Sequence, residues 1–578
     1  MVYLKYQPKG DASMKKLLLV FLSLLLICSM VLVGCGPKDE DPEDDLGATE
    51  NEDGTYSVST TYLPSALSTS IGTMLADEDD ESFYIANLKN APFLMVDDMQ
   101  ISDCKVKSIS IPIYKTLESD NGVFTFTLCV VRADSLSNLK DTLNNPLKKY
   151  TISIDGSRYG LEDSQTVRQY VKIDLKEYDI SLTKTQTLAF GDPDDTILPA
   201  IIRNDKAKTD DNPAAKLFTD SWGVVSYYYY NEDGAFSIAH SSLLFDLVLE
   251  RTYESKEAYE QLIADAESAA ADYQAKLAAV KAKYEGKYIS MMGDSISTCE
   301  GVTNNTQYNS TIGSNAVYGQ HKKAAPAYHY SKIYWGRFAT DVGMNLDVMN
   351  AWSGGRVYGK SEASYNDNML KRSYQLANND GVNPDLVILY YGINDINSSP
   401  SSIYNPGHNL SSVVQYDPTS NLYQQLQNKG TKTESEIVAA WFAEVQAKAA
   451  DAGYIRTDEN PVITPGQTYS CWEAAYALSL YNILNSYNGP DVYIMTLIET
   501  NHSSANDGKL DRANTILRAF AEYFDVGLID QQQGYVLRNN CHLYTYDTES
   551  SLHPNIKGHA LMTKLIVETV YDRISREQ

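Results

Sequence analysis

The 578-residue sequence has few cysteines and few basic residues for its length, and both shortages narrow what the protein can be. The seven cysteines include no CxxC pair and no His/Cys cluster with metal-ligand spacing, which argues against a metal site and against a disulfide scaffold. Lys and Arg number 48 against 75 Asp and Glu, so the formal net charge is -27. A chain this acidic repels phosphates, so we expect no nucleic-acid partner.

Phenylalanine is also scarce, with 13 copies against 43 tyrosines. Rings with a hydroxyl group suit wet, polar ligands such as sugars, although ordinary sheet faces account for most of these tyrosines. The four consecutive tyrosines at 227–230 are a candidate sugar platform. Because side chains alternate along a strand, two of the four would face the core in any case.

The N-terminus has the pattern of an export signal. Lys15 and Lys16 precede an uncharged run at 17–33, which is typical of a secretory signal rather than a spanning helix. The run ends in Leu-Val-Gly-Cys35, which resembles the lipobox of bacterial lipoproteins. This resemblance implies a signal peptide over residues 1–35 and an exported chain that two acyl chains on Cys35 anchor to the cell membrane. An ordinary signal peptide or an uncleaved anchor is the alternative.

Residues 36–55 are rich in Asp, Glu, Pro and Gly, which predicts a disordered acidic tether. Once Cys28 leaves with the signal and Cys35 is lipidated, five cysteines remain. An odd count leaves at least one thiol unpaired, so we expect no disulfide framework. Cys104 and Cys129 are the only candidates for a pair.

Residues 56–252 contain short apolar runs separated by turn-forming residues, which predicts an antiparallel β-sandwich. The expected strands are 106–114, 123–131, 150–154, 171–175, 187–190, 222–230 and 243–249. This part resembles the sandwich modules that accompany carbohydrate-active enzymes, which implies a possible carbohydrate-binding role. In residues 253–286 the apolar residues no longer alternate but recur every third or fourth position, which is helical spacing. These residues are Leu262, Ala266, Ala269, Tyr273 and Leu277. We expect a long linker helix there.

Residues 287–578 alternate between apolar strands and helical stretches, which predicts an α/β fold with a doubly wound parallel sheet in three layers. The expected strands are 288–292, 346–350, 386–391, 492–498 and 526–529, and the expected helices are 331–342, 471–485, 509–524 and 556–570. Ligands of such sheets bind beyond the carboxyl ends of the strands. The polar motifs of this half all occupy such ends.

Four of these motifs follow one another in a fixed order. They are Gly293-Asp294-Ser295, Ser353-Gly354-Gly355, Gly392-Ile393-Asn394-Asp395 and His553-Pro554-Asn555. In this order they resemble the four blocks of the SGNH (GDSL-like) hydrolases, and the segments NAVYG, YWGRF and NAWSGGRV resemble a bacterial branch of that family. The resemblance covers about residues 285–575 and implies a flavodoxin-like hydrolase domain.

The resemblance implies a role for each block. Ser295 is the expected nucleophile and His553 the base, because a serine hydroxyl reacts only when a base accepts its proton and histidine titrates near neutral pH. The tetrahedral oxyanion needs donors that are already in place. The family takes them from the serine amide, from the block II glycine amide, here Gly354, and from the block III asparagine, here Asn394. We expect no metal and no nucleotide cofactor.

One departure from the family concerns the acid that orients the histidine. The last block is usually Asp-x-x-His, but this chain has Ser550 three residues before His553. Asp547 and Glu549 are nearby alternatives, and a dyad without an acid is a third possibility. This substitution raises the possibility of a weak or degenerate enzyme.

Other polar residues near the motifs have structural interpretations. We expect Asp294 to bond turn amides and Asp395 to fix the loop that holds Asn394. His559 is expected along the final helix, and His502 lies in a polar loop that could face the cleft. A polar insertion at 397–470, with a short helix near 434–450, is expected either to cover Ser295 as a lid or to be simple decoration.

Together these features predict a surface-anchored serine esterase that removes acyl groups, chiefly acetyl, from an extracellular polysaccharide. Its expected partners are the acylated polysaccharide and the membrane, which it reaches through the lipid on Cys35. Two alternatives stay open: an O-acyltransferase that uses the same serine, and a glycan-binding surface lipoprotein with a degenerate hydrolase domain.

Overall fold

The computed structural model divides into two compact units, Met1–Ala275 and Lys276–Gln578. The structure describes residues 47–62, 83–85, 93–96, 103–132, 145–183, 186–191, 194–203, 225–230, 236–239, 241–243, 246–297, 333–351, 355–357, 369–377, 382–396, 422–451, 472–500, 508–538, 541–545, 552–554 and 556–577.

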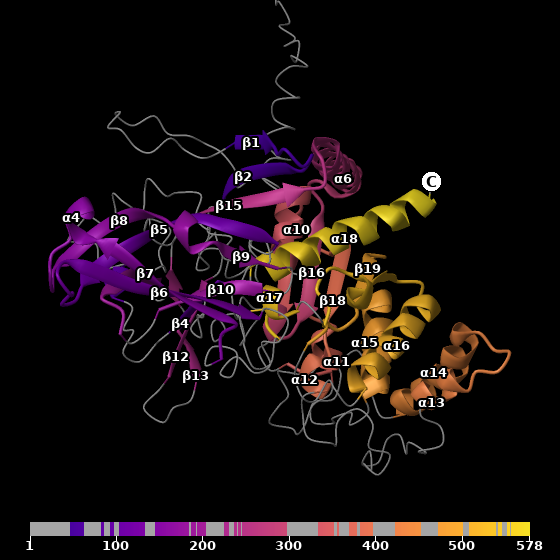
Figure 1. The fold of residues 1–578 in the computed structure, drawn as a ribbon. Coiled ribbons are helices and arrows are strands. Elements are labelled where there is room, and N and C mark those ends of the chain that lie inside the picture. Colours follow the sequence, from indigo (N-terminus) through magenta and orange to yellow (C-terminus); the bar gives the residue numbers. More distant parts are fainter. Residues whose placement is uncertain are drawn as a thin grey trace, which may run out of the picture. The chain divides into compact units, whose positions relative to one another are not determined.

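Among its described residues, unit 1 consists mainly of two antiparallel sheets (Figure 1). The larger contains β1 (Gly47–Glu50), β2 (Tyr56–Tyr62), β3 (Phe83–Ile85), β5 (Cys104–Thr116), β8 (Thr166–Asp174), β9 (Ile180–Leu182), β11 (Ile197–Arg203), β14 (Ser241–Leu243) and β15 (Asp246–Tyr253). The smaller contains β4 (Phe93–Val96), β6 (Val123–Arg132), β7 (Lys148–Asp155), β10 (Gln186–Phe190), β12 (Val225–Tyr230) and β13 (Phe236–Ala239). Their main paths are β1-β2-β15-β5-β11-β14 and β13-β12-β4-β10-β6-β7.

Both sheets of unit 1 contribute side chains to one apolar core. Ile111 on β5 and Val171 on β8 belong to it, as do Phe126 on β6 and Ile152 on β7. The alternation of buried and exposed residues along β7 shows how one face of a strand is turned toward this core. The apolar runs at 106–114, 123–131, 150–154 and 171–175 therefore mark strands whose buried residues form this core. The tyrosines at 227–230 lie on β12, and their sugar-binding role stays a prediction.

Cys104 and Cys129, the only candidates for a pair, form no disulfide. Cys104 lies on β5 and Cys129 on β6, so the two thiols belong to different sheets. Both are buried, and burial raises the pKa of the Cys104 thiol to about 11. A thiol that stays protonated is a poor nucleophile, so Cys104 is chemically inert.

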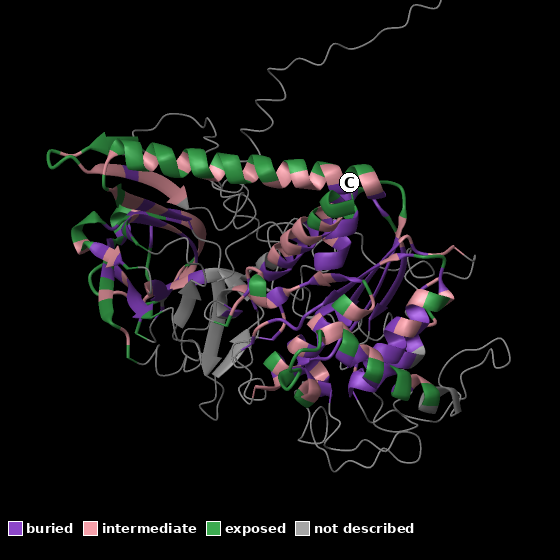
Figure 2. Ribbon diagram, turned by 90° about the vertical axis from the view of Figure 1, so that its right-hand side faces the viewer, coloured by how far each residue is buried: buried purple, intermediate pink, exposed green. Residues whose placement is uncertain are grey.

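The long helix α6 (Lys256–Tyr284) is exposed or half-buried over most of its length (Figure 2). Its buried residues are Val280 and Tyr284, near its C-terminal end. There Lys283 forms ion pairs with Asp491 at 3.1 Å and with Glu577 at 3.1 Å. The end of the helix therefore belongs to unit 2, and the division between the units falls inside the helix.

Unit 2 is built on a parallel sheet. Its strands are β16 (Tyr288–Gly293), β17 (Asn345–Ala351), β18 (Leu386–Tyr390), β19 (Asp491–Met495) and β20 (Gly527–Ile529), in the order β17-β16-β18-β19-β20. β18 is buried throughout, and β16 and β19 at all but their first residue, so both faces of the sheet are covered. The order is the flavodoxin-like one, in which the direction of winding reverses between the first and third strands, here β16 and β18.

Several helices of unit 2 pack in two groups. In one, α10 (Tyr334–Val342) packs against α18 (Ile556–Glu577). The other contains α11 (Met369–Arg372), α13 (Leu422–Gln427), α14 (Glu434–Asp451), α15 (Trp472–Ser486) and α16 (Lys509–Tyr523). The expected helices therefore form close to their predicted bounds, and the last continues to Glu577.

The helical part of the 397–470 insertion packs on the other helices. Trp441 on α14 stacks on Phe520 of α16 with ring centroids 6.0 Å apart, and Phe442 meets Phe524 edge-on at 5.2 Å. α13 and α14 thus form part of the packed helix group. Residues 397–421 and 452–470 lie outside the described residues, so the lid stays a prediction.

Candidate active site

Ser295 occupies a tight turn at the carboxyl end of β16. The strand ends at Gly293, and Ser295 begins the short helix η4 (Ser295–Ser297). Asp294 accepts a hydrogen bond from the Ile296 amide at 3.1 Å, which is the turn-bonding role expected for it. Glycine is required at 293, because a Cβ there would lie 2.1 Å from the Ser297 Oγ. The sequence therefore forces a sharp turn that carries Ser295.

His553 lies beside Ser295. Its Nε2 is 2.9 Å from the Ser295 Oγ, within hydrogen-bonding distance. Pro554, the next residue, forms an isolated β-bridge with Thr545, and α18 begins at Ile556. Ser295 is buried and His553 half-buried. The structure thus brings together the two residues that the sequence predicts as nucleophile and base, and imidazole at this distance can accept the hydroxyl proton.

Asn394 is held at the end of β18 by hydrogen bonds with the segment that follows β17. Its Nδ2 donates to the Gly355 carbonyl at 3.0 Å, and the Asp395 carboxylate accepts from the Val357 amide at 3.0 Å. Gly392, with φ of 127°, makes the turn into α12 (Ile393–Ile396). A primary amide has two N–H groups, and the bond to Gly355 fixes the plane of both. Asp395 therefore anchors this loop as expected.

The strand register places these groups at one edge of the sheet. Gly293 pairs with Ala351 of β17 and with Tyr390 of β18, so the three strands end at the same level. The Ser295 turn and the Asn394 turn follow β16 and β18, the two strands at which the winding reverses. In open α/β sheets ligands bind at this point.

The remaining predicted site residues lie outside the described part of the chain. They are Gly354, Ser550, Asp547, Glu549, Cys35 and the loop residue His502. Their roles stay predictions.

Three buried residues near the site were not predicted as functional: Ser297, Tyr334 and His559. The Tyr334 hydroxyl and the Ser297 Oγ are 2.7 Å apart, and the Tyr334 ring stacks on His559 with centroids 5.9 Å apart. Burial holds the pKa of Tyr334 well above its ordinary value, so its hydroxyl stays protonated. His559 lies on α18, as the sequence predicts. Only its spacing from His553 could have drawn attention to it.

Acid should destabilise unit 2 through His559. Burial, and then the charge of nearby His553, lower the pKa of His559 to about 3. The unfolded chain, with an ordinary histidine pKa of about 6.5, therefore binds more protons than the folded chain between these values. The stability that neutral His559 gives the folded state is fully present above about pH 6.5 and is lost as the pH falls toward 3. The folding equilibrium constant then falls by up to about tenfold per pH unit. Denaturant unfolding at several pH values measures this slope.

The control for this prediction is His559→Gln, which keeps an acceptor but does not titrate. We expect a flatter dependence of the unfolding free energy on pH in the variant. Equal slopes in the two proteins would show that His559 does not cause the acid sensitivity.

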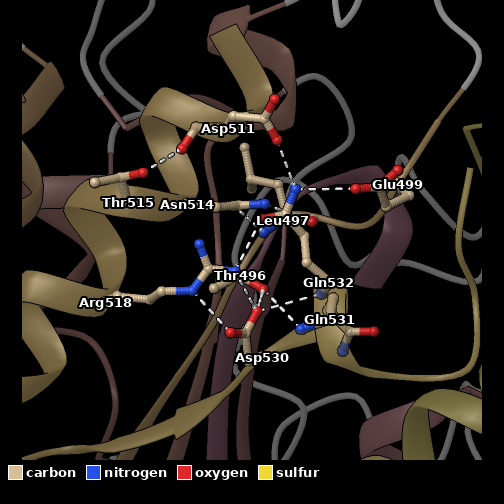
Figure 3. Close-up of polar contacts among 10 residues, drawn as sticks. All are labelled: Thr496, Leu497, Glu499, Asp511, Asn514, Thr515, Arg518, Asp530, Gln531 and Gln532. Carbon is tan, nitrogen blue, oxygen red and sulfur yellow. Dashed lines mark hydrogen bonds and ion pairs between the residues drawn. The ribbon is translucent and has the colours of Figure 1, made fainter. Parts of the chain in front are cut away.

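A polar network fixes the chain beyond β19 and β20 (Figure 3). Asp530 accepts two hydrogen bonds from Arg518, both at 2.8 Å, and one from Thr496 at 3.0 Å. Asn514 exchanges hydrogen bonds with the Leu497 backbone at 2.7 and 3.2 Å. The expected strand at 492–498 ends early, at Met495. The Thr496 amide still donates to the Ile529 carbonyl at 3.0 Å, but side chains bind the backbone of the two residues that follow.

Within the described ranges, no group of three or more His, Cys, Asp or Glu side chains has an arrangement that could hold a metal ion. None of the helices in the described part of the chain has the length and apolar character needed to cross a membrane.

Comparisons with known proteins give weak likenesses only. Neither a protein-family model nor a curated protein matches the chain. A GDSL-like lipase structure from Bacteroides ovatus is 14% identical, with a TM-score of 0.28, over 51% of this chain and 100% of that one. A family two carbohydrate esterase from Clostridium thermocellum, in complex with cellohexaose, is 11% identical, with a TM-score of 0.27, over 86% and 97%.

An acetyl xylan esterase from Geobacillus stearothermophilus is 13% identical, with a TM-score of 0.25, over 50% of this chain and 95% of that one. The solved structures similar to this chain thus include GDSL-like lipases and carbohydrate esterases. Identities and TM-scores this low assign neither an activity nor a substrate to the chain.

Proposed function

We propose that this chain is a serine esterase of the SGNH (GDSL-like) hydrolase family that removes acyl groups, chiefly acetyl, from a polysaccharide. One observation carries the proposal: the Ser295 Oγ and the His553 Nε2 are 2.9 Å apart at the carboxyl edge of a parallel sheet. The four sequence blocks support it, because each block supplies one part of an acyl-transfer site. We also propose that the domain is a three-layer doubly wound sheet, as the sequence predicts.

In the proposed reaction, His553 accepts the Ser295 proton while the Oγ attacks the ester carbonyl carbon. The carbonyl oxygen becomes an oxyanion, which accepts hydrogen bonds from the amides of Ser295 and Gly354 and from the Asn394 side chain. The C–O bond to the sugar then breaks, and the imidazolium returns the proton to the leaving sugar oxygen. Water, deprotonated by His553, attacks the acyl-enzyme and releases the carboxylic acid and free Ser295.

The sugar part of the proposal rests on several sequence features. An export signal, an abundance of tyrosine and an N-terminal unit of two antiparallel sheets suit a protein that meets glycans outside the cell. We propose that unit 1 is a β-sandwich that binds carbohydrate. An assay of acetate release from acetylated xylan, in parallel with p-nitrophenyl acetate, tests the proposal. Turnover of neither substrate would contradict it and favour the glycan-binding alternative.

The same assay separates hydrolysis from transfer. With an excess of unacetylated xylo-oligosaccharide, a hydrolase releases free acetate at an unchanged rate, because water remains the acceptor. An acyltransferase would instead yield acetylated oligosaccharide at the expense of acetate. Mass spectrometry of the oligosaccharide distinguishes the two outcomes.

We further propose that the chain is anchored outside the cytoplasm through a diacylated Cys35. Two acyl chains hold a protein to a bilayer stably, whereas none leaves it soluble. In the bacterial cell, Cys35→Ala should therefore move the protein from the membrane fraction to the medium or the periplasm, or leave it unprocessed. Equal membrane association of the mature wild type and variant would refute the lipid anchor.

A further inference from the structure

Tyr334, the first residue of α10, contacts both the nucleophile turn and the helix that follows His553. Its hydroxyl lies 2.7 Å from the Oγ of Ser297, two residues after Ser295. Its amide donates to the His559 Nδ1 at 3.4 Å, and its carbonyl accepts from the Thr563 hydroxyl at 3.0 Å. One residue therefore binds both the turn that carries Ser295 and the helix α18, which begins three residues after His553.

Burial makes these contacts rigid. Tyr334, Ser297 and His559 have no exposed surface. Hydrogen bonds in such surroundings are stronger than in water, and a buried hydroxyl left without a partner destabilises the fold. Neither segment can shift without breaking a buried contact.

Hydrogen bonds of the turn couple the position of Ser297 to that of Ser295. The Ser297 amide donates to the Asp294 carbonyl at 3.0 Å, which closes the turn around Ser295. The indole of Trp335 also donates to the Ser297 carbonyl at 3.0 Å, so α10 holds the turn through two consecutive residues. The position of the Ser295 hydroxyl is thus coupled to that of α10.

We propose that Tyr334 is a positioning residue that holds Ser295 and His553 at the separation needed for proton transfer. This inference rests on the proposed esterase function. It has particular weight in this chain, because Ser550 stands where the family has the acid that orients the histidine. Alignment of the pair then depends more on the contacts of α10 with the two segments.

Tyr334→Phe tests the proposal, because it removes only the hydroxyl and keeps the ring and both backbone hydrogen bonds. We expect kcat for p-nitrophenyl acetate to fall about tenfold with KM unchanged, since a displacement of 1 Å in a catalytic group costs about 100-fold. The rate at which a fluorophosphonate labels Ser295 should fall by the same factor. Labelling reports nucleophile activation directly, which a purely stabilising role would not change below the unfolding temperature.

Ser297→Ala removes the same hydrogen bond from the other side and guards against misfolding of the first variant. If Tyr334 acts through Ser297, the double variant should be no slower than the slower single variant. Tyr476→Phe is the matched control, because Tyr476 is fully buried and its hydroxyl has no hydrogen-bond partner in the described part of the structure. We expect its labelling rate to match that of the wild type.

Labelling and kcat at wild-type values in both single variants would overturn the proposal, and so would multiplicative losses in the double variant. The proposed function is tested separately, by labelling of the wild type that Ser295→Ala abolishes. Wild-type labelling that does not depend on Ser295 would overturn the esterase function, and the positioning role with it.

Discussion

Replacing Ser295 with alanine should lower kcat for the hydrolysis of p-nitrophenyl acetate at least about 1,000-fold. The variant has no nucleophile for acyl transfer, and losses of this kind in serine hydrolases reach about 10⁶-fold in kcat. The side chain is small and lies at a turn whose bonds come from Asp294 and the backbone, so the fold should persist. Release of p-nitrophenol by wild type and variant gives the ratio.

Ser575→Ala on α18 is the matched control. This serine is exposed, and its hydroxyl donates only locally, to the Tyr571 carbonyl at 2.9 Å. It should hydrolyse the substrate at the wild-type rate. Equal background rates in wild type, Ser295→Ala and Ser575→Ala would eliminate the esterase and leave the glycan-binding lipoprotein.

Replacing Asn394 with alanine should reduce kcat about 100- to 1,000-fold and change KM little. An oxyanion-hole donor acts on charge that appears only in the transition state, so its loss affects kcat. The bond from its amide to the Gly355 carbonyl shows that the donor is oriented before substrate arrives. Steady-state kinetics of the variant, with thermal unfolding to exclude misfolding, provide the measurement.

Asn485→Ala serves as its control, because that amide donates to the Tyr481 carbonyl on the exposed surface of α15. We expect unchanged kinetics there. A kcat for Asn394→Ala within about threefold of the wild type would remove Asn394 from the oxyanion site and leave it as a loop anchor.

Most strands of unit 2 could be predicted from the sequence, because each apolar run has the length of a buried strand. Each run also ends in residues that do not continue a strand. The run before Ser295 is an example: strand β16 ends where Gly293 is required by the close approach of Ser297. The end of β19 could not be predicted in this way. Residues 496–498 are as apolar as a strand, but Asn514 and Asp530, distant in sequence, bind that backbone and its side chains.

The Ser295–His553 contact could be predicted because motifs carry both residues. Tyr334 could not, since its role depends on two other segments that meet only in the folded chain. In the sequence it is one aromatic residue among 43 tyrosines. In unit 1, short strands such as β1 and β9 have too few apolar residues to give a pattern.

The order of the elements in unit 2 also determines when the site can exist. Ser295 follows the first strand of the sheet, whereas His553 precedes the last helix, 258 residues later. A nascent chain leaves the ribosome N-terminus first, so it carries the serine long before its base has been synthesised. In an exported chain that crosses the membrane unfolded, esterase chemistry would begin only after the final helix had crossed. Timing of this kind would keep the cytoplasm free of the activity without any inhibitor or pro-segment.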